Sequence, residues 1–107
     1  MKGELLKGNL DMLLLSVVAE RPSHGYAMIE ELRRRSNGAF DLPEGTVYPA
    51  LHRLEAAGLV SSRWSEGTGR RRRVYDIRRK GREALHASRD EWSAFARAVR
   101  SVMAEGA

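Results

Sequence analysis

The chain has 107 residues, a formal net charge of +5 and no cysteine. One small domain accounts for this length, the excess of lysine and arginine favours a polyanionic partner, and disulfides and thiolate metal sites are excluded. No apolar run reaches the ~18 residues of a membrane span, so we expect a cytoplasmic protein with no membrane partner.

The first predicted element is a helix from about Glu4 to Ala19. Between Leu10 and Val18 nearly every position is apolar, whereas a surface helix needs only one apolar stripe. A helix that is apolar all round must be covered on several sides. Two covers stay open: the core of the domain itself, or a second subunit, for which Leu10 and Leu14 are candidate contacts.

A second helix is expected from His24 to about Arg35, because Arg21-Pro22 ends the first helix and Ser23 is a favourable N-cap. The apolar residues expected to face inward from this helix are Tyr26, Ile29 and Leu32. Beyond it, the alternation in Phe40-Asp41-Leu42 predicts a very short strand.

The stretch from Pro43 to Val60 predicts a third, amphipathic helix that ends at Gly58. Its opposite face is small near the start and then offers hydrogen-bonding side chains, a surface that suits the DNA major groove. An ordinary amphipathic helix leading into a strand fits the same pattern. The apolar stripe is Val47, Leu51, Leu54 and Gly58, and the candidate DNA-binding residues are Thr46, Tyr48, His52 and Arg53.

The start of this third helix stays open between Glu44 and Thr46, because Pro43 and Pro49 both lack a backbone N–H. A start at Glu44 would disturb the backbone bond to Gly45. We therefore expect a loose or 3₁₀-like first turn.

Two strands are expected next, over Leu59–Trp64 and Arg71–Ile77, joined by a polar connection with two glycines that is typical of a hairpin. Four consecutive arginines lie at the tip and base of this hairpin. A charge run can be only a solvated face, but its place after the third helix favours contact with DNA phosphates or the minor groove. These arginines are Arg70, Arg71, Arg72 and Arg73.

A long helix from Arg79 to about Glu105 is the last predicted element. Its apolar positions recur at spacings of 3, 4, 3, 4 and 3, which is the seam of a heptad pattern and indicates a dimerisation arm. The seam consists of Leu85, Ser88, Trp92, Phe95, Val99 and Val102.

Catalytic and metal-binding motifs are missing from the sequence. There is no nucleophile elbow, phosphate-binding loop or paired carboxylate arrangement, and His24, His52 and His86 lie in different elements without metal-ligand spacing. We therefore expect neither an enzyme nor a cofactor or metal.

Three segments resemble one family. Residues 46–60, TVYPALHRLEAAGLV, are similar to the recognition-helix signature of the PadR family of bacterial transcriptional regulators. Residues 8–32, with their S-H-G-Y junction, resemble the first two helices of that family, and residues 69–77 resemble its wing. The chain departs from the family pattern at Arg78, where Thr is frequent, and at Leu42-Pro43, where a small polar cap is common.

The resemblance implies an α+β, mainly α fold. Residues 1–78 would form a winged helix-turn-helix, and residues 79–107 a long C-terminal dimerisation helix in one compact unit with it. It also implies the short subfamily, whose members dimerise through the last helix and the first.

The function implied is that of a homodimeric repressor of transcription that binds a pseudo-palindromic double-stranded DNA operator and is released by a small molecule or stress signal. A winged-helix protein-interaction module and a non-specific architectural DNA binder are the alternatives. In some members a Trp on the last helix stacks planar aromatic effectors between the two copies. Trp92, with Phe95 beside it, matches that place, although both could be ordinary interface core.

Overall fold

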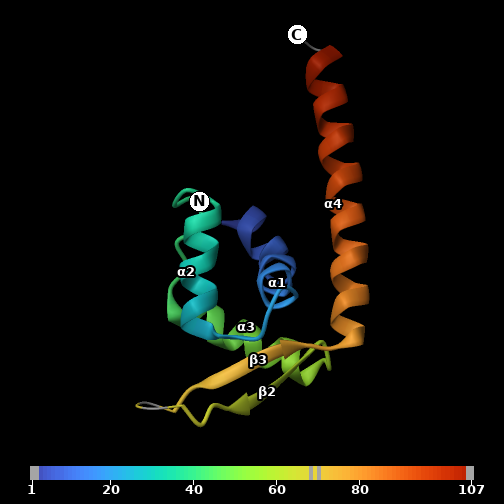
Figure 1. Cartoon of the computed structure of the whole chain (residues 1–107). Helices are drawn as coiled ribbons and strands as arrows, with labels where there is room; N and C mark the ends of the chain where they lie inside the picture. Colours follow the sequence, from blue (N-terminus) through green and yellow to red (C-terminus); the bar gives the residue numbers. More distant parts are fainter. Residues whose placement is uncertain (1–2, 68, 70, 106–107) are drawn as a thin grey trace.

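The computed structural model describes residues 3–67, 69 and 71–105, which form four helices and a three-stranded antiparallel sheet with the order β1-β3-β2 (Figure 1). This mainly helical α+β arrangement confirms the predicted winged helix-turn-helix with a long last helix. The elements in chain order are α1 (Glu4–Val18), β1 (Ser23–His24), α2 (Gly25–Arg35), α3 (Glu44–Ala56), β2 (Val60–Trp64), β3 (Arg73–Ile77) and α4 (Arg79–Glu105).

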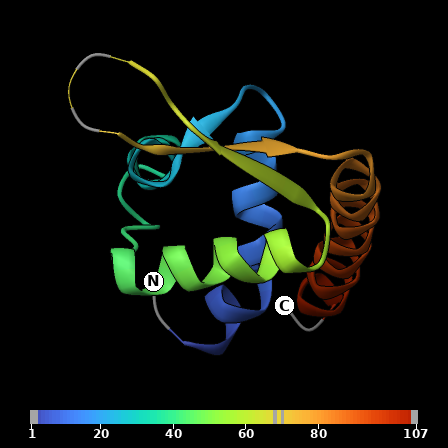
Figure 2. The same cartoon turned by 90° about the horizontal axis from the view of Figure 1, so that it is seen from below.

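Helix α1 lies at the centre of the molecule, in contact with α2, α3, α4 and β3 (Figures 1 and 2). Its C-terminal half supplies Leu14, Leu15 and Val18, which are almost fully buried against Met28 of α2 and Leu51 of α3. The C-terminal half of this helix therefore serves the core of the single chain.

The start of α2 differs from the prediction. Ser23 and His24 pair with Tyr75 and Val74 of β3, so the helix begins at Gly25 and His24, not Ser23, is the N-cap. Tyr26 is 54% exposed, so its inward placement was wrong, whereas Ile29 and Leu32 are buried as predicted. In the first turns of α2, the side chain that enters the core is that of Met28.

The predicted strand over residues 40–42 is also wrong. These residues pair with no neighbouring strand, and Leu42 is buried in the core. The segment therefore anchors the α2–α3 connection to the core through Leu42, with Phe40 packed against the same core.

Helix α3 starts at Glu44, with Pro43 as its N-cap. The N–H groups of both Thr46 and Val47 donate to the Pro43 carbonyl, at 3.0 and 3.2 Å, which is the 3₁₀-like tightening that we predicted for the first turn. At the other end Gly58 has a φ of 78°, and the Leu59 N–H donates to the Leu54 carbonyl. This Schellman motif turns the chain directly into β2.

Helix α4 is joined closely to the sheet and then leaves it. A Cβ on Gly81 would lie 2.1 Å from the carbonyl oxygen of Leu59, so only glycine fits where the first turn of α4 crosses the chain before β2. Leu85 is buried one turn later. The C-terminal half of the helix projects beyond the other elements, and the molecule is 57 Å long in consequence (Figure 1).

Candidate nucleic-acid interface

A groove of about 530 Å³ separates α3 from the β2–β3 hairpin. Figure 2 looks onto α3 with the hairpin beside it. We call this space the α3–hairpin groove. Three guanidinium groups and one carboxylate, that of Glu44, line it together with aromatic rings and imidazoles, so its charge favours an anionic ligand. Its lining residues are His24, Tyr26, Glu44, Tyr48, His52, Trp64, Arg71, Arg72, Arg73 and Tyr75.

Trp64 holds two of the hairpin arginines. It lies opposite Arg73 in the β2–β3 register, and the guanidinium carbons of Arg71 and Arg73 lie 4.8 and 4.9 Å from the centroid of its ring. Guanidinium groups at this distance are attracted by the negative face of an indole. Two positive charges are thus held against one ring at the wall of the groove.

A chain of hydrogen bonds fixes the hairpin to α3. Arg73 Nε donates to Ser62 Oγ at 2.9 Å, and Ser62 Oγ donates to Glu55 Oε2 of α3 at 2.7 Å. Burial raises the pKa of the nearby Tyr75 hydroxyl, and the Glu55 carboxylate raises it further, so Tyr75 adds no charge to the groove near neutral pH. The two walls of the groove therefore keep a defined separation.

Tyr48 and His52 lie one turn apart on the α3 wall. The end of the Tyr48 ring packs against Gly25 at the start of α2, where an added Cβ would come within 2.7 Å of it. The absence of a side chain at Gly25 therefore leaves room for the Tyr48 ring at this place. His52 is exposed and is free to reach a ligand along the groove.

The predicted DNA-binding residues divide into three groups. Tyr48, His52 and Arg71–Arg73 come together in the α3–hairpin groove. Thr46 and Arg53 are exposed on the other flank of α3, where Arg53 Nη2 lies 3.0 Å from Asp11 Oδ1 of α1. Arg70 lies outside the described residues.

Sequence reasoning missed five residues of the groove. His24, Tyr26 and Glu44 come from the starts of α2 and α3, Trp64 from the end of β2, and Tyr75 from β3. The register of the hairpin is the signal that could have found Trp64, because it places that side chain across from the arginine run.

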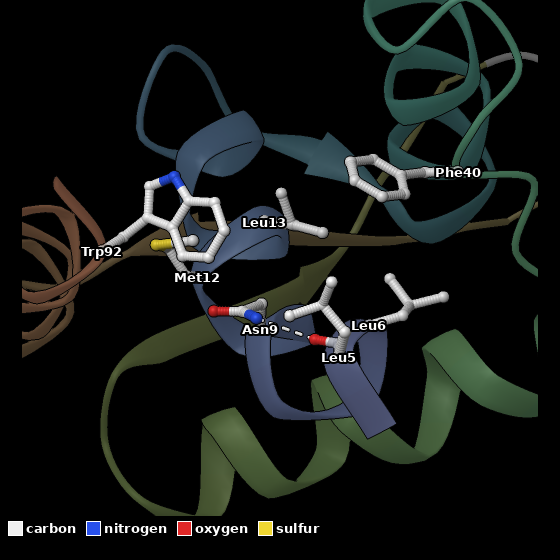
Figure 3. A pocket seen from close by; sticks show the side chains of 7 residues that line it. All are labelled: Leu5, Leu6, Asn9, Met12, Leu13, Phe40 and Trp92. Carbon is white, nitrogen blue, oxygen red and sulfur yellow. Dashed lines mark hydrogen bonds between the residues drawn. The ribbon is translucent and has the colours of Figure 1, made fainter. Parts of the chain in front are cut away.

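A second, apolar recess of about 230 Å³ lies between the N-terminal half of α1 and α4. Trp92 and Phe40 lie at its opposite ends, with leucines of α1 between them (Figure 3). Asn9, the polar lining residue, is engaged, since its Nδ2 donates to the Leu5 carbonyl at 2.7 Å. The recess is suited to apolar groups and offers little to an anion.

The heptad seam of α4 is divided between the core and the surface. Leu85 is buried within the chain, as are Leu10 and Leu14 of α1, so these three cannot supply free contact surface. Ser88 is half-buried. The exposed seam, as we name it from here on, consists of Trp92, Phe95, Val99 and Val102, of which Phe95 and Val102 are 58% and 73% exposed.

In the part of the chain that the structure describes, no group of three or more His, Cys, Asp or Glu side chains could hold a metal ion. Within the same residues, no helix combines the length and apolar character needed to cross a membrane.

Comparisons with known proteins agree with this architecture. A family model described as "Transcriptional regulator PadR-like family" matches residues 14–87. The transcriptional regulator Rv3488 of Mycobacterium tuberculosis is 36% identical over 96 residues, which cover 90% of this chain and 87% of that protein.

Two solved structures are also similar. A transcriptional regulator from Clostridium thermocellum superimposes with a TM-score of 0.87 at 27% identity, covering 94% of this chain and 96% of that one. A PadR family transcriptional regulator from Eggerthella lenta gives a TM-score of 0.82 at 30% identity, covering 92% and 85%.

Proposed function

The chain belongs to the PadR-like family of transcriptional regulators, and from this premise we propose that it represses transcription as a homodimer bound to double-stranded DNA. PadR-like proteins are regulators and not enzymes, which agrees with the catalytic motifs missing from the sequence. In this proposal residues 1–78 bind DNA, residues 79–107 join two copies, and the protein acts in the cytoplasm.

Helix α3 would enter the major groove. Its outer side is small at Gly45 and Pro49, which allows close approach, and Tyr48 and His52 follow with groups that can donate to or accept from base edges. Thr46 and Arg53 would contact the DNA from the opposite flank of the helix. Arg53 can turn from Asp11 to a phosphate at little cost, because both side chains of that ion pair are more than half exposed.

The observation that carries the proposal is the pair of guanidinium groups stacked on Trp64. Arg71 and Arg73 are both held on this ring and line the groove together with Tyr48 and His52 of α3. Phosphate contacts of this kind supply sequence-independent affinity and fix the register of the recognition helix. A protein-interaction module would need neither the guanidinium pair nor the small face of α3.

The homodimer would form through the exposed seam of α4. Two-fold pairing of Trp92, Phe95, Val99 and Val102 would cover apolar side chains that the single chain leaves in water. Such a dimer presents two copies of α3, so the operator would be pseudo-palindromic, with half-sites roughly 34–36 Å apart.

Release from DNA would follow when a planar aromatic effector binds at Trp92. The apolar recess holds about 230 Å³, which is below the roughly 300–1,000 Å³ of small-molecule sites, so one chain supplies only part of a pocket. A second copy across the exposed seam would bring its own Trp92 and Phe95 and complete the site. An occupied site would change the spacing of the two halves of the dimer. If no effector exists, Trp92 and Phe95 are simply interface core.

The proposal is tested by replacing Arg71 with alanine. Affinity should fall on every duplex, and the slope of log affinity against log salt should flatten by about one unit, because one phosphate contact is lost. Fluorescence anisotropy at four or more salt concentrations measures both quantities.

Arg97→Ala is the matched control, since it removes the same charge from the face of α4 opposite the exposed seam. It should leave the slope unchanged. An unchanged slope for Arg71→Ala as well would show that the hairpin arginines are only a solvated face.

A further inference from the structure

His24 makes two contacts with its two ring nitrogens. As the N-cap of α2, it accepts the Ala27 N–H through Nδ1 at 3.2 Å. Its other nitrogen, Nε2, lies 3.0 Å from Nη1 of Arg72, 48 residues away on the hairpin. Both side chains line the α3–hairpin groove.

The capping contact determines which nitrogen carries the proton. A neutral imidazole has one N–H, so a ring that accepts at Nδ1 carries its hydrogen on Nε2. Burial lowers the pKa of His24, and the positive charge of Arg72 lowers it further, which keeps the ring neutral near neutral pH. A protonated ring would also lose the lone pair that caps α2.

Two donors therefore face each other. The Nε2–H of His24 points to a guanidinium group that has only donors, and the 3.0 Å between them leaves neither one satisfied by the other. An anionic oxygen that both groups can donate to resolves this arrangement. Arg71 and Arg73 on the same wall make the surroundings positive, which favours an anion over a neutral acceptor.

We propose that His24 Nε2 and the Arg72 guanidinium together bind one phosphate of the DNA backbone. This inference rests on the proposed function and adds to it a neutral residue at the N-cap of α2. In helix-turn-helix proteins the helix before the recognition helix crosses the DNA backbone. His24 caps the corresponding helix here, α2, and lines the same groove as Tyr48 of α3. The pair thus fixes the backbone at the edge of the α3–hairpin groove, while α3 contacts the bases.

The opposite tautomer gives a different role. With its hydrogen on Nδ1, His24 would accept from Arg72 at Nε2, lose the cap of α2, and act only by positioning the guanidinium group. The two roles predict different salt dependence. If His24 only positions Arg72, replacing His24 weakens the charged contact of Arg72 and should flatten the salt slope. If His24 itself binds the phosphate, the slope should stay the same.

The test uses His24→Ser, Arg72→Ala and the double variant in DNA titrations at several salt concentrations. Serine keeps an N-cap for α2 but cannot reach Arg72 or its phosphate. We expect His24→Ser to lose about tenfold in affinity on every duplex, as a hydrogen bond to a charged group predicts, with an unchanged salt slope because His24 is neutral. Arg72→Ala should flatten the slope by about one unit.

The double variant should lose less than the product of the two single losses, since both groups serve one phosphate. His86→Ser, at an exposed position on α4, is the matched control and should bind like the wild type. Wild-type affinity for His24→Ser would overturn the site. The site would also be overturned if the salt slope of His24→Ser flattened as much as that of Arg72→Ala. That result would show that His24 only positions Arg72.

Ring ¹⁵N chemical shifts of the free wild-type protein give a readout that needs no DNA. The Nε2–H tautomer is expected at neutral pH, and the Nδ1–H tautomer would overturn the phosphate site. A wild-type protein that binds no DNA would instead contradict the proposed function itself, so the two failures are distinguishable.

Discussion

Replacing Val99 with aspartate is expected to dissociate the proposed homodimer and to abolish operator binding. Val99 lies at the middle of the exposed seam, between Phe95 and Val102, where two-fold pairing would bring two new carboxylates into an apolar contact. Placing a charge in such a contact costs several kcal/mol, and each 1.4 kcal/mol is about tenfold in affinity, so the dimer should weaken by at least about a hundredfold. Sedimentation velocity across a concentration series measures the change.

Ser101→Asp is the matched control for this prediction. It places the same charge within one turn of Val99 but on the opposite, exposed face of α4. This variant should remain dimeric and should bind the operator. If Val99→Asp sediments as a dimer like the control, the exposed seam is not the interface.

Replacing Gly81 with alanine is expected to lower the free energy of unfolding by about 3 kcal/mol, at the upper end of overpacking effects. Alanine has the higher helix propensity, but that gain is only about 1 kcal/mol. The added Cβ would lie 2.1 Å from the Leu59 carbonyl oxygen and 2.9 Å from Cγ1 of Ile77. That same carbonyl accepts the Arg78 N–H at 2.9 Å, so the backbone cannot move away without losing the bond.

Thermal unfolding followed by circular dichroism tests this balance of steric and propensity effects. Gly45→Ala is the control, because Gly45 also lies in the first turn of a helix but has open space around the added Cβ. The free energy of unfolding of the Gly45→Ala variant should rise by roughly 0.5–1 kcal/mol. A similar rise for Gly81→Ala would contradict the close crossing of α4 over the chain before β2.

The helices could be predicted from the sequence because their signals are local. Periodicity and end signals placed the first and last helices within one residue of α1 and α4. The helical phase of residues 43–60 also identified Tyr48 and His52 as outward-facing, and both line the α3–hairpin groove. The signal in each case lies within a few residues of the position that it predicts.

The features that were missed depend on residues far apart in the chain. Ser23 would be a good N-cap in isolation, but its pairing with Tyr75 moves the start of α2 to Gly25. The partner of Arg53 is Asp11, 42 residues away, and no local pattern indicates that pair. Residues 40–42 alternate like a strand yet have no strand beside them.

The assignment of α1 shows a further limit of the sequence. Its apolar surface could be covered by the core or by a second copy, and composition cannot distinguish the two. In the structure Leu10 and Leu14 lie in the core, while Leu5, near the start of the same helix, is 53% exposed beside Trp92. One helix thus serves the core with its C-terminal half and leaves its start to the proposed dimer.

Footprinting on the DNA upstream of the protein's own coding sequence, followed by titration of the protected duplex, tests whether the protein binds an operator sequence-specifically. The duplex and a scrambled duplex of the same composition are compared at one salt concentration. We predict protection of a pseudo-palindrome with half-sites about one helical turn apart, and an affinity at least about 10³-fold above that for the scrambled duplex. Equal affinity for both duplexes would identify a non-specific architectural binder, and binding to neither would indicate a protein-interaction module; with either result, the protein would not be an operator-specific repressor.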